Sequence, residues 1–302
     1  MVGAGLGLLL LAAAVVFTLK DADFSPLTQT PPYLAVLLLL SSTMSFFLTG
    51  LFFHVVSKSF CPDPPVGFWT MQQLIALGTV LNYIPVVRLG MWSRALYLRM
   101  YHRLPIASSL LATLVVLAVS VVSYVVIVLP LAFGSSPHLL GIAALSLLLL
   151  SLVTAPGMKM LLRFAAKFRA VHHAPPSRLT LAWTYVPINL ADLLNNSLRL
   201  YLAFYVLGQP IPFTTIIIAT CASLIVRIAG LTPNGLGLSE WVVAGLATAI
   251  SPVSAATGAA AALIDRASDV LVSIPLALIS AYKLRHVLHA KAHQKTAADK
   301  TS

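Results

Sequence analysis

The chain of 302 residues is 59% hydrophobic and only 9% charged, with a formal net charge of +11. A soluble domain carries roughly a quarter charged residues, so this composition excludes an ordinary soluble domain and predicts an all-α polytopic membrane protein. The basic residues lie in short segments between apolar runs, not on one face with interleaved aromatic residues, so we expect no nucleic-acid partner.

Six apolar runs are long enough to cross the hydrocarbon layer, which requires about 20 helical residues. They are residues 2–19, 33–57, 105–131, 137–156, 179–207 and 252–282. The first run lacks the basic start and the small-residue cleavage site of a secretory signal, so we interpret it as a membrane helix. The sequence therefore predicts about six full transmembrane helices.

Two further apolar stretches are interrupted by helix-breaking residues. Residues 67–103 break at the Asn-Tyr-Ile-Pro of residues 82–85, and residues 213–250 break at the Thr-Pro-Asn-Gly-Leu-Gly of residues 232–237. Proline and glycine stop helices. Because non-helical backbone is tolerated at membrane depth only where it is buried in protein or lines a cavity, the two breaks predict an interior site.

Lysine and arginine are unevenly distributed among the connecting segments. Residues 20–32 and the loops near 134 and 208 carry little or no basic charge. The basic segments are Lys58, residues 88–103, residues 159–178 and the tail from Lys283. Since basic loops stay in the cytoplasm, we predict a cell (inner) membrane protein with both termini cytoplasmic. The charges agree only if both broken stretches are re-entrant hairpins that enter from opposite sides.

Three predicted spans separate the hairpins, so the two hairpins and their following helices would have opposite orientations. Such inverted repeats, here residues 67–131 and 213–282, are typical of secondary transporters. We predict one membrane domain over residues 1–285, followed by a basic cytoplasmic tail over residues 286–302. The alternative is that one hairpin crosses the membrane fully and the charge rule fails locally.

The run 179–207 carries a polar stripe. An ionisable group within a span costs at least about 2.5 kcal/mol on insertion scales, so it needs a partner or an aqueous cavity. The stripe residues are three or four positions apart and share one helix face. They are Tyr185, Asn189, Asp192, Asn196 and Arg199. The stripe forms either a hydrogen-bonded seam between helices or the wall of a cavity.

The last predicted span contains Asp265, Arg266 and Asp269 near its middle. The two aspartates lie one turn apart on the same face, so their charges repel unless a cation or a proton lies between them. Arg266 points to another side of the helix. Arg199 or Arg227 is therefore the better candidate partner.

Charged residues also follow both breaks. Glu240 begins the short helix after the second break, either as a cap favoured by the helix dipole or as a functional acid. A half-helix that starts at membrane depth presents unpaired N–H groups that attract an anion. Arg88 and Arg94 follow the first break closely and could grip a phosphate, although positive-inside topology also explains them.

These features give one candidate substrate-binding site built from the breaks and the buried charges. Its residues are Arg88, Arg94, Asp192, Asn196, Arg199, Arg227, Pro233, Gly235, Gly237, Glu240, Asp265, Arg266 and Asp269. The tail histidines His286, His289 and His293 have a spacing that could hold a metal, but a helix at the lipid surface is the commoner explanation. Because no catalytic triad, phosphate-binding glycine loop or zinc pattern is visible, we expect no enzyme activity, cofactor or metal.

Two motifs resemble the transmembrane region of lysylphosphatidylglycerol synthases, a flippase-like family with free-standing members. Residues 231–240, Leu-Thr-Pro-Asn-Gly-Leu-Gly-Leu-Ser-Glu, are similar to the family's T-P-G-G-L-G-x-R-E, and Arg266 and Asp269 match the R-x-x-D that follows. The resemblance covers about residues 67–282. The family's P-x-x-R-x-G-x-x-x-R-A is matched by Pro85, Arg88, Gly90, Arg94 and Ala95.

The chain also departs from this pattern. Asn234 stands at a glycine of the motif, Ser239 at its usual arginine, and Met91 where glutamate is frequent. The chain ends shortly after its last predicted span, so we expect no soluble aminoacyl-transfer domain and no lipid synthesis by this chain.

The resemblance implies a membrane lipid as substrate. The leading hypothesis is a lipid flippase or lipid transporter that moves a phospholipid or lipid-linked head group through a charged midplane cavity. Arg88, Arg94 and the half-helix ends would hold its phosphate. Glu240, Asp265 and Asp269 would balance buried arginines, bind a cationic head group or carry protons. The alternative is a non-catalytic membrane scaffold or accessory subunit of a lipid- or glycan-modifying enzyme, acting as a homo-oligomer or with a partner enzyme.

Overall fold

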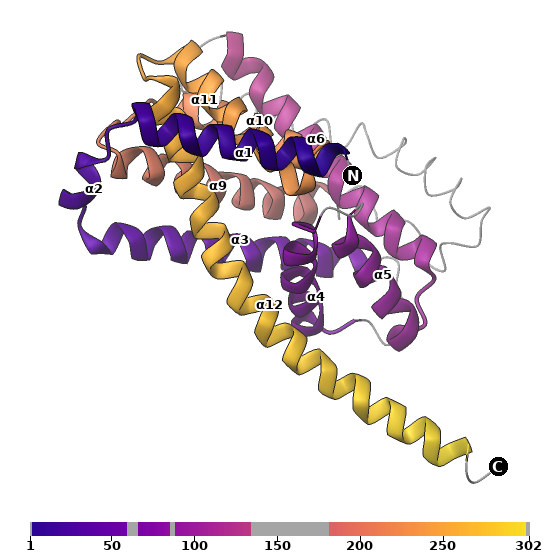
Figure 1. Ribbon diagram of the computed structural model, residues 1–302. Coiled ribbons are helices and arrows are strands. Elements are labelled where there is room, and N and C mark those ends of the chain that lie inside the picture. The colour runs from indigo at the N-terminus through magenta and orange to yellow at the C-terminus, as the bar shows by residue number, and fades with distance from the viewer. Residues whose placement is uncertain (1, 59–65, 85–87, 134–180, 300–302) are drawn as a thin grey trace.

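The computed structural model describes residues 2–58, 66–84, 88–133 and 181–299, and every regular element in these ranges is helical (Figure 1). This confirms the all-α prediction. The predicted span 137–156 and Pro85 lie outside the described residues. The helices are α1 (Val2–Asp21), α2 (Ser25–Gln29), α3 (Pro32–Lys58), α4 (Phe68–Leu81), α5 (Leu89–His102), α6 (Ile106–Phe133), η1 (Leu181–Tyr185), α9 (Val186–Val206), α10 (Phe213–Ala229), η2 (Pro233–Gly235), α11 (Leu238–Ile250) and α12 (Ala255–Asp299).

Two helices in the described part of the chain are long and apolar enough to cross a membrane by length and composition. They are Pro32–Lys58 and Ile106–Leu131. Their positions agree with the predicted runs 33–57 and 105–131. The predicted number of six crossings stays a prediction.

The last helix is longer than the predicted span. α12 continues from Ala255 to Asp299 and extends beyond the other helices toward the C-terminus (Figure 1). The helix continues past residue 282 because the following residues are mostly good helix formers such as alanine, lysine and leucine; the end of the membrane span at residue 282 stays a prediction. The basic tail, as far as residue 299, is thus a continuation of α12.

The first break separates two short helices as predicted. α4 and α5 have 14 residues each, which corresponds to about 21 Å and is shorter than the hydrocarbon layer of about 30 Å. The Asn82 side chain accepts a hydrogen bond from the Gly90 backbone at 3.0 Å, near the start of α5. A Cβ atom on Gly90 would lie 2.0 Å from the carbonyl oxygen of Gly78. The two backbones therefore touch beside the break.

The second break lies between α10 and α11 and contains the short helix η2. Gly237 has a φ of 78°, and a Cβ atom there would lie 2.5 Å from the Cβ of Leu10 in α1. Gly235 has a φ of 71°, and its Cβ would lie 2.8 Å from the Cγ of Arg227. Glycine adopts such a conformation readily. The positive φ and the lack of space for a Cβ atom therefore explain why the motif has glycine at both positions.

The helices form two sets, α3–α6 and α9–α12, with matching contacts. α3 packs on α4 and α6, just as α9 packs on α10 and α12. The first half-helix of each set contacts the last helix of the other set, so that α4 lies against α12 and α10 against α6. α3 and α9 pack on each other. Such an exchange is expected of two repeats related by a pseudo-two-fold axis; the inverted repeats over residues 67–131 and 213–282 stay a prediction.

Candidate functional site

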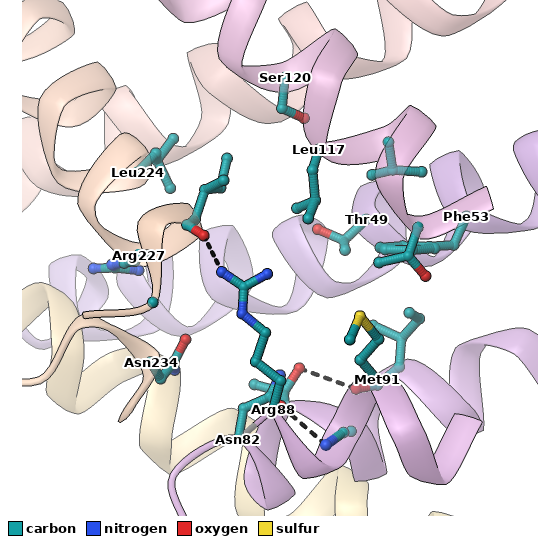
Figure 2. A pocket seen from close by; sticks show the side chains of 18 of the residues that line it. Thr49, Phe53, Asn82, Arg88, Met91, Leu117, Ser120, Leu224, Arg227 and Asn234 are labelled. Carbon is teal, nitrogen blue, oxygen red and sulfur yellow. Dashed lines mark hydrogen bonds between the residues drawn. The ribbon is translucent and has the colours of Figure 1, made fainter. Parts of the chain in front are cut away.

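The two breaks face one cavity of about 470 Å³ (Figure 2). Helices α3, α4, α5, α6, α9 and α10 supply most of its wall. The break residues that line it include Asn82, Ile84 and Arg88 from the first break and Thr232, Pro233 and Asn234 from the second. Segments about 150 residues apart in the sequence therefore meet at one cavity.

Arg88 spans the gap between the breaks. It precedes α5 with a left-handed φ of 48°, and its Nη2 donates a hydrogen bond to the carbonyl of Ile228 near the end of α10 (Figure 2). Gly230 leaves room for this guanidinium, since a Cβ there would lie 2.7 Å from the Arg88 Nη2. Arg88 makes no ion pair with any described carboxylate.

Arg94 is a buried cation in the cavity wall, only 7% exposed. Its Nη2 donates to the Thr113 hydroxyl at 2.6 Å, and its guanidinium lies 4.0 Å from the centroid of the Phe53 ring. Within the described ranges no carboxylate pairs with it. A desolvated cation without an acid is unfavourable unless an anion or water approaches, so this part of the cavity favours an anion.

Four charged residues beside the cavity, of which only Arg227 lines it, form a network of ion pairs. Arg199, 1% exposed, donates from Nε to Asp265 Oδ1 at 2.6 Å and from Nη1 to Asp269. Arg227 bridges the same two carboxylates, at 3.2 Å to Asp265 and 3.3 Å to Asp269. The two positive and two negative charges cancel. The predicted pairing of the aspartates with Arg199 or Arg227 is confirmed, and both arginines take part.

A second ion pair joins α12 to the second break. Arg266 Nε donates to Glu240 Oε1 at 3.0 Å, and Glu240 is 1% exposed. The other Arg266 nitrogens donate to the Ser239 hydroxyl at 2.8 Å and the Asn234 carbonyl at 3.1 Å. Arg266 also approaches the Tyr83 hydroxyl of the first break at 3.5 Å. Glu240 is therefore more than a helix cap, because its ion pair holds α11 to α12.

Asp192 lines the cavity without an ion pair among the described residues. Its Oδ1 accepts hydrogen bonds from Ser45 at 2.8 Å and from Asn196 at 3.0 Å. Asn195, next to this pair on α9, exchanges hydrogen bonds with Ser41 on α3. The predicted stripe thus serves in part as the α3–α9 seam and in part as cavity wall.

The structure divides the predicted site residues into two groups. Those that line the cavity are Arg88, Arg94, Asp192, Arg227 and Pro233. Those that are not in the cavity lining are Asn196, Arg199, Gly235, Gly237, Glu240, Asp265, Arg266 and Asp269. In the second group, the charged residues are neutralised by ion pairs and the two glycines shape the second break. The cavity therefore carries fewer charged residues than the sequence predicted.

Sequence reasoning missed several partners of these residues. Phe53 and Thr113 contact Arg94, Tyr83 contacts Arg266, and Ser45 contacts Asp192. All are neutral residues of ordinary membrane helices or of the first break, so nothing in their local pattern marks them. Asn82, whose side chain accepts the hydrogen bond from Gly90, carried a recognisable signal because asparagine favours turns.

Comparison with known families gives one match over most of the chain. The family described as the lysylphosphatidylglycerol synthase TM region matches residues 5–277. Comparisons with curated proteins and with solved structures gave no match. The matched segment includes both breaks, the cavity and both ion-pair networks.

Proposed function

We propose that this chain, which belongs to the family of the lysylphosphatidylglycerol synthase TM region, is a lipid flippase or lipid transporter. Membership of the family indicates a membrane role related to lipids. In the proposal, the head group of a phospholipid or lipid-linked substrate enters the cavity between the breaks while the membrane supplies the substrate. The chain itself performs no covalent chemistry.

One observation carries the proposal: Arg88 and Arg94 line the cavity, and neither has a carboxylate partner among the described residues. Guanidinium groups bind phosphate through paired, charge-assisted hydrogen bonds. The remaining buried arginines already have acids, so they do not compete for the ligand. A phosphate between Arg88 and Arg94 would supply the missing negative charge.

The proposed path also depends on how the helices lie in the membrane. α4 and α5 are each too short to cross it alone, and α11 has only 13 residues. Short helices that meet at midplane breaks fit re-entrant hairpins, with unpaired backbone groups facing a protected cavity. We therefore retain, as part of the proposal, opposed hairpins in the cell membrane and both termini in the cytoplasm.

The test is translocation of fluorescent phosphatidylglycerol in reconstituted vesicles. Arg94→Ala removes one charge-assisted contact with the phosphate, so we expect the rate to fall about tenfold or more. Arg99→Ala is the matched control, because Arg99 lies on the same helix but is exposed and outside the cavity. Equal rates for wild type and Arg94→Ala, or no protein-dependent translocation, would contradict the proposal.

A scaffold or accessory subunit is the second candidate, acting as a homo-oligomer or with a partner enzyme. The observation that favours it is the neutral network of Arg199, Arg227, Asp265 and Asp269. Its ion pairs join α9 and α10 to α12, as a purely structural network would. A lipid- or glycan-modifying enzyme that copurifies in fixed ratio, together with no lipid movement by the chain alone, would favour this candidate.

A further inference from the structure

Asp192 differs from the other acids of the described interior. Those acids pair with arginine: Glu240, Asp265 and Asp269. Asp192 pairs with no described base, and its Oδ1 is held only by the neutral donors of Ser45 and Asn196. No described residue donates a hydrogen bond to its Oδ2. An ionised carboxylate away from bulk water is unfavourable in free energy without a cation. The surroundings of Asp192 therefore favour its protonated form.

Asp192 is accessible to a proton from the cavity. Asp192 lines the same cavity as Arg88 and Arg94. Asn189, one turn earlier on α9, also lines it and is 2% exposed, yet its Nδ2 has no hydrogen-bond partner in the described structure. An unsatisfied buried amide beside an unpaired carboxylate indicates that water or a ligand group occupies this end of the cavity.

The elements that pack on α9 are η1, α3, α6, α10 and α12. The charged or titratable groups that interact with Asp192 are Arg199 on α9, Tyr124 on α6 and Asp269 on α12. Arg227 and Cys221 on α10 interact with Tyr124, and Asp265 on α12 pairs with Arg199 and Arg227. The two arginines and two aspartates of this set neutralise one another. Beside Asp192, α3 contributes the hydroxyl of Ser45, while Tyr33, His54 and Lys58 lie more than two turns farther along that helix.

We propose that Asp192 binds a proton from the cavity when the head-group phosphate binds to Arg88 and Arg94, so that lipid and proton are taken up together. This inference rests on the proposed function. The bound phosphate adds a negative charge near Asp192 and thereby favours the neutral carboxyl. Binding linkage is reciprocal, so protonation of Asp192 strengthens phosphate binding by the same factor. The proton comes from the bulk solution by way of the cavity, and the carboxylate becomes the carboxylic acid.

The test is the binding of a short-chain phosphatidylglycerol, dihexanoyl phosphatidylglycerol, to the purified full chain at about pH 5.5 and about pH 8. We expect wild type to bind at least about fivefold more tightly at the lower pH. Asp192→Asn mimics the protonated acid, so it should bind equally at both pH values, near the low-pH affinity of wild type. Asp21→Asn, at the exposed end of α1, should keep the wild-type dependence.

A direct measurement on wild type does not depend on any variant. In weakly buffered solution with a pH indicator, addition of the same lipid should withdraw protons from the solution. No uptake, binding by wild type that is independent of pH, or an unchanged pH dependence in Asp192→Asn would overturn this inference and leave the head-group site standing. No binding by wild type at either pH would contradict both the inference and the proposed function.

Discussion

The charged residues of the interior have two different kinds of surroundings. Some are closed into ion pairs whose hydrogen-bonding groups are largely satisfied, as for Arg266 with Glu240, Ser239 and Asn234. Others line the cavity and pair with no described carboxylate, as for Arg88 and Arg94. A buried pair contributes little net stability but is costly to break. We therefore assign the paired residues to structure and the unpaired residues to ligand binding.

This division predicts how the Arg266–Glu240 pair responds to substitution. Arg266→Met leaves Glu240 as an unpaired buried charge, so the free energy of unfolding should fall by about 3–5 kcal/mol. Adding Glu240→Gln removes that charge and should restore a large part of the loss. The measurement is equilibrium unfolding in detergent. Arg285→Met, on the exposed part of α12, is the control and should change little; additive single and double effects would contradict the assignment.

At the residue scale, the sequence predicted which helix face a residue occupies wherever helical periodicity determines that face. The spacing of Asp265 and Asp269 placed both on one face with either a cation or a proton between them, and the structure shows the cations. The partners of Arg94 were not predictable, because Thr113 and Phe53 belong to other helices. Their approach depends on tertiary packing, which a single sequence does not encode in a local pattern.

At the scale of elements, both breaks were located from composition alone. Proline and glycine in the second break, and asparagine before the first proline, stop helices by known backbone chemistry. The close approach of α4 and α5 at Gly78 and Gly90 was not anticipated. The helical continuation of α12 to Asp299 did not follow from the apolar run, because loss of hydrophobicity at residue 282 marks the end of an apolar run and not the end of a helix.

The re-entrant hairpins predict which ends of the elements lie on the same side of the membrane. In a chain with Cys61 and Cys221 replaced by serine, Lys58→Cys and Arg99→Cys should both react with an impermeant maleimide only from the cytoplasmic side. Gln209→Cys and Ser254→Cys should react only from the outer side. All four side chains are exposed.

These labelling results separate a hairpin from a crossing pair. If α4 and α5 together crossed the membrane, Lys58→Cys and Arg99→Cys would be labelled from opposite sides. The same comparison of Gln209→Cys with Ser254→Cys applies to α10 and α11. Either opposite-sided result would contradict the proposed topology for that hairpin.

For the whole molecule, the meeting of the breaks is the main structural result. Arg88 contacts the carbonyl of Ile228, and Arg266 joins Asn234 to the neighbourhood of Tyr83. The exchanged contacts of α4 with α12 and of α10 with α6 bring the two halves together at this point. The sequence predicted two repeats and an interior site, but which residues of each repeat face the other followed only from their packing.

We propose that a lipid phosphate binds between the breaks. The most direct measurement is an experimental structure of the full chain in a lipid nanodisc that contains phosphatidylglycerol. We predict density for a phosphate within hydrogen-bonding distance of both Arg88 and Arg94, with the acyl chains leading toward the bilayer. Lipid density confined to the outer surface of the helices, with only water beside Arg88 and Arg94, would contradict the claim.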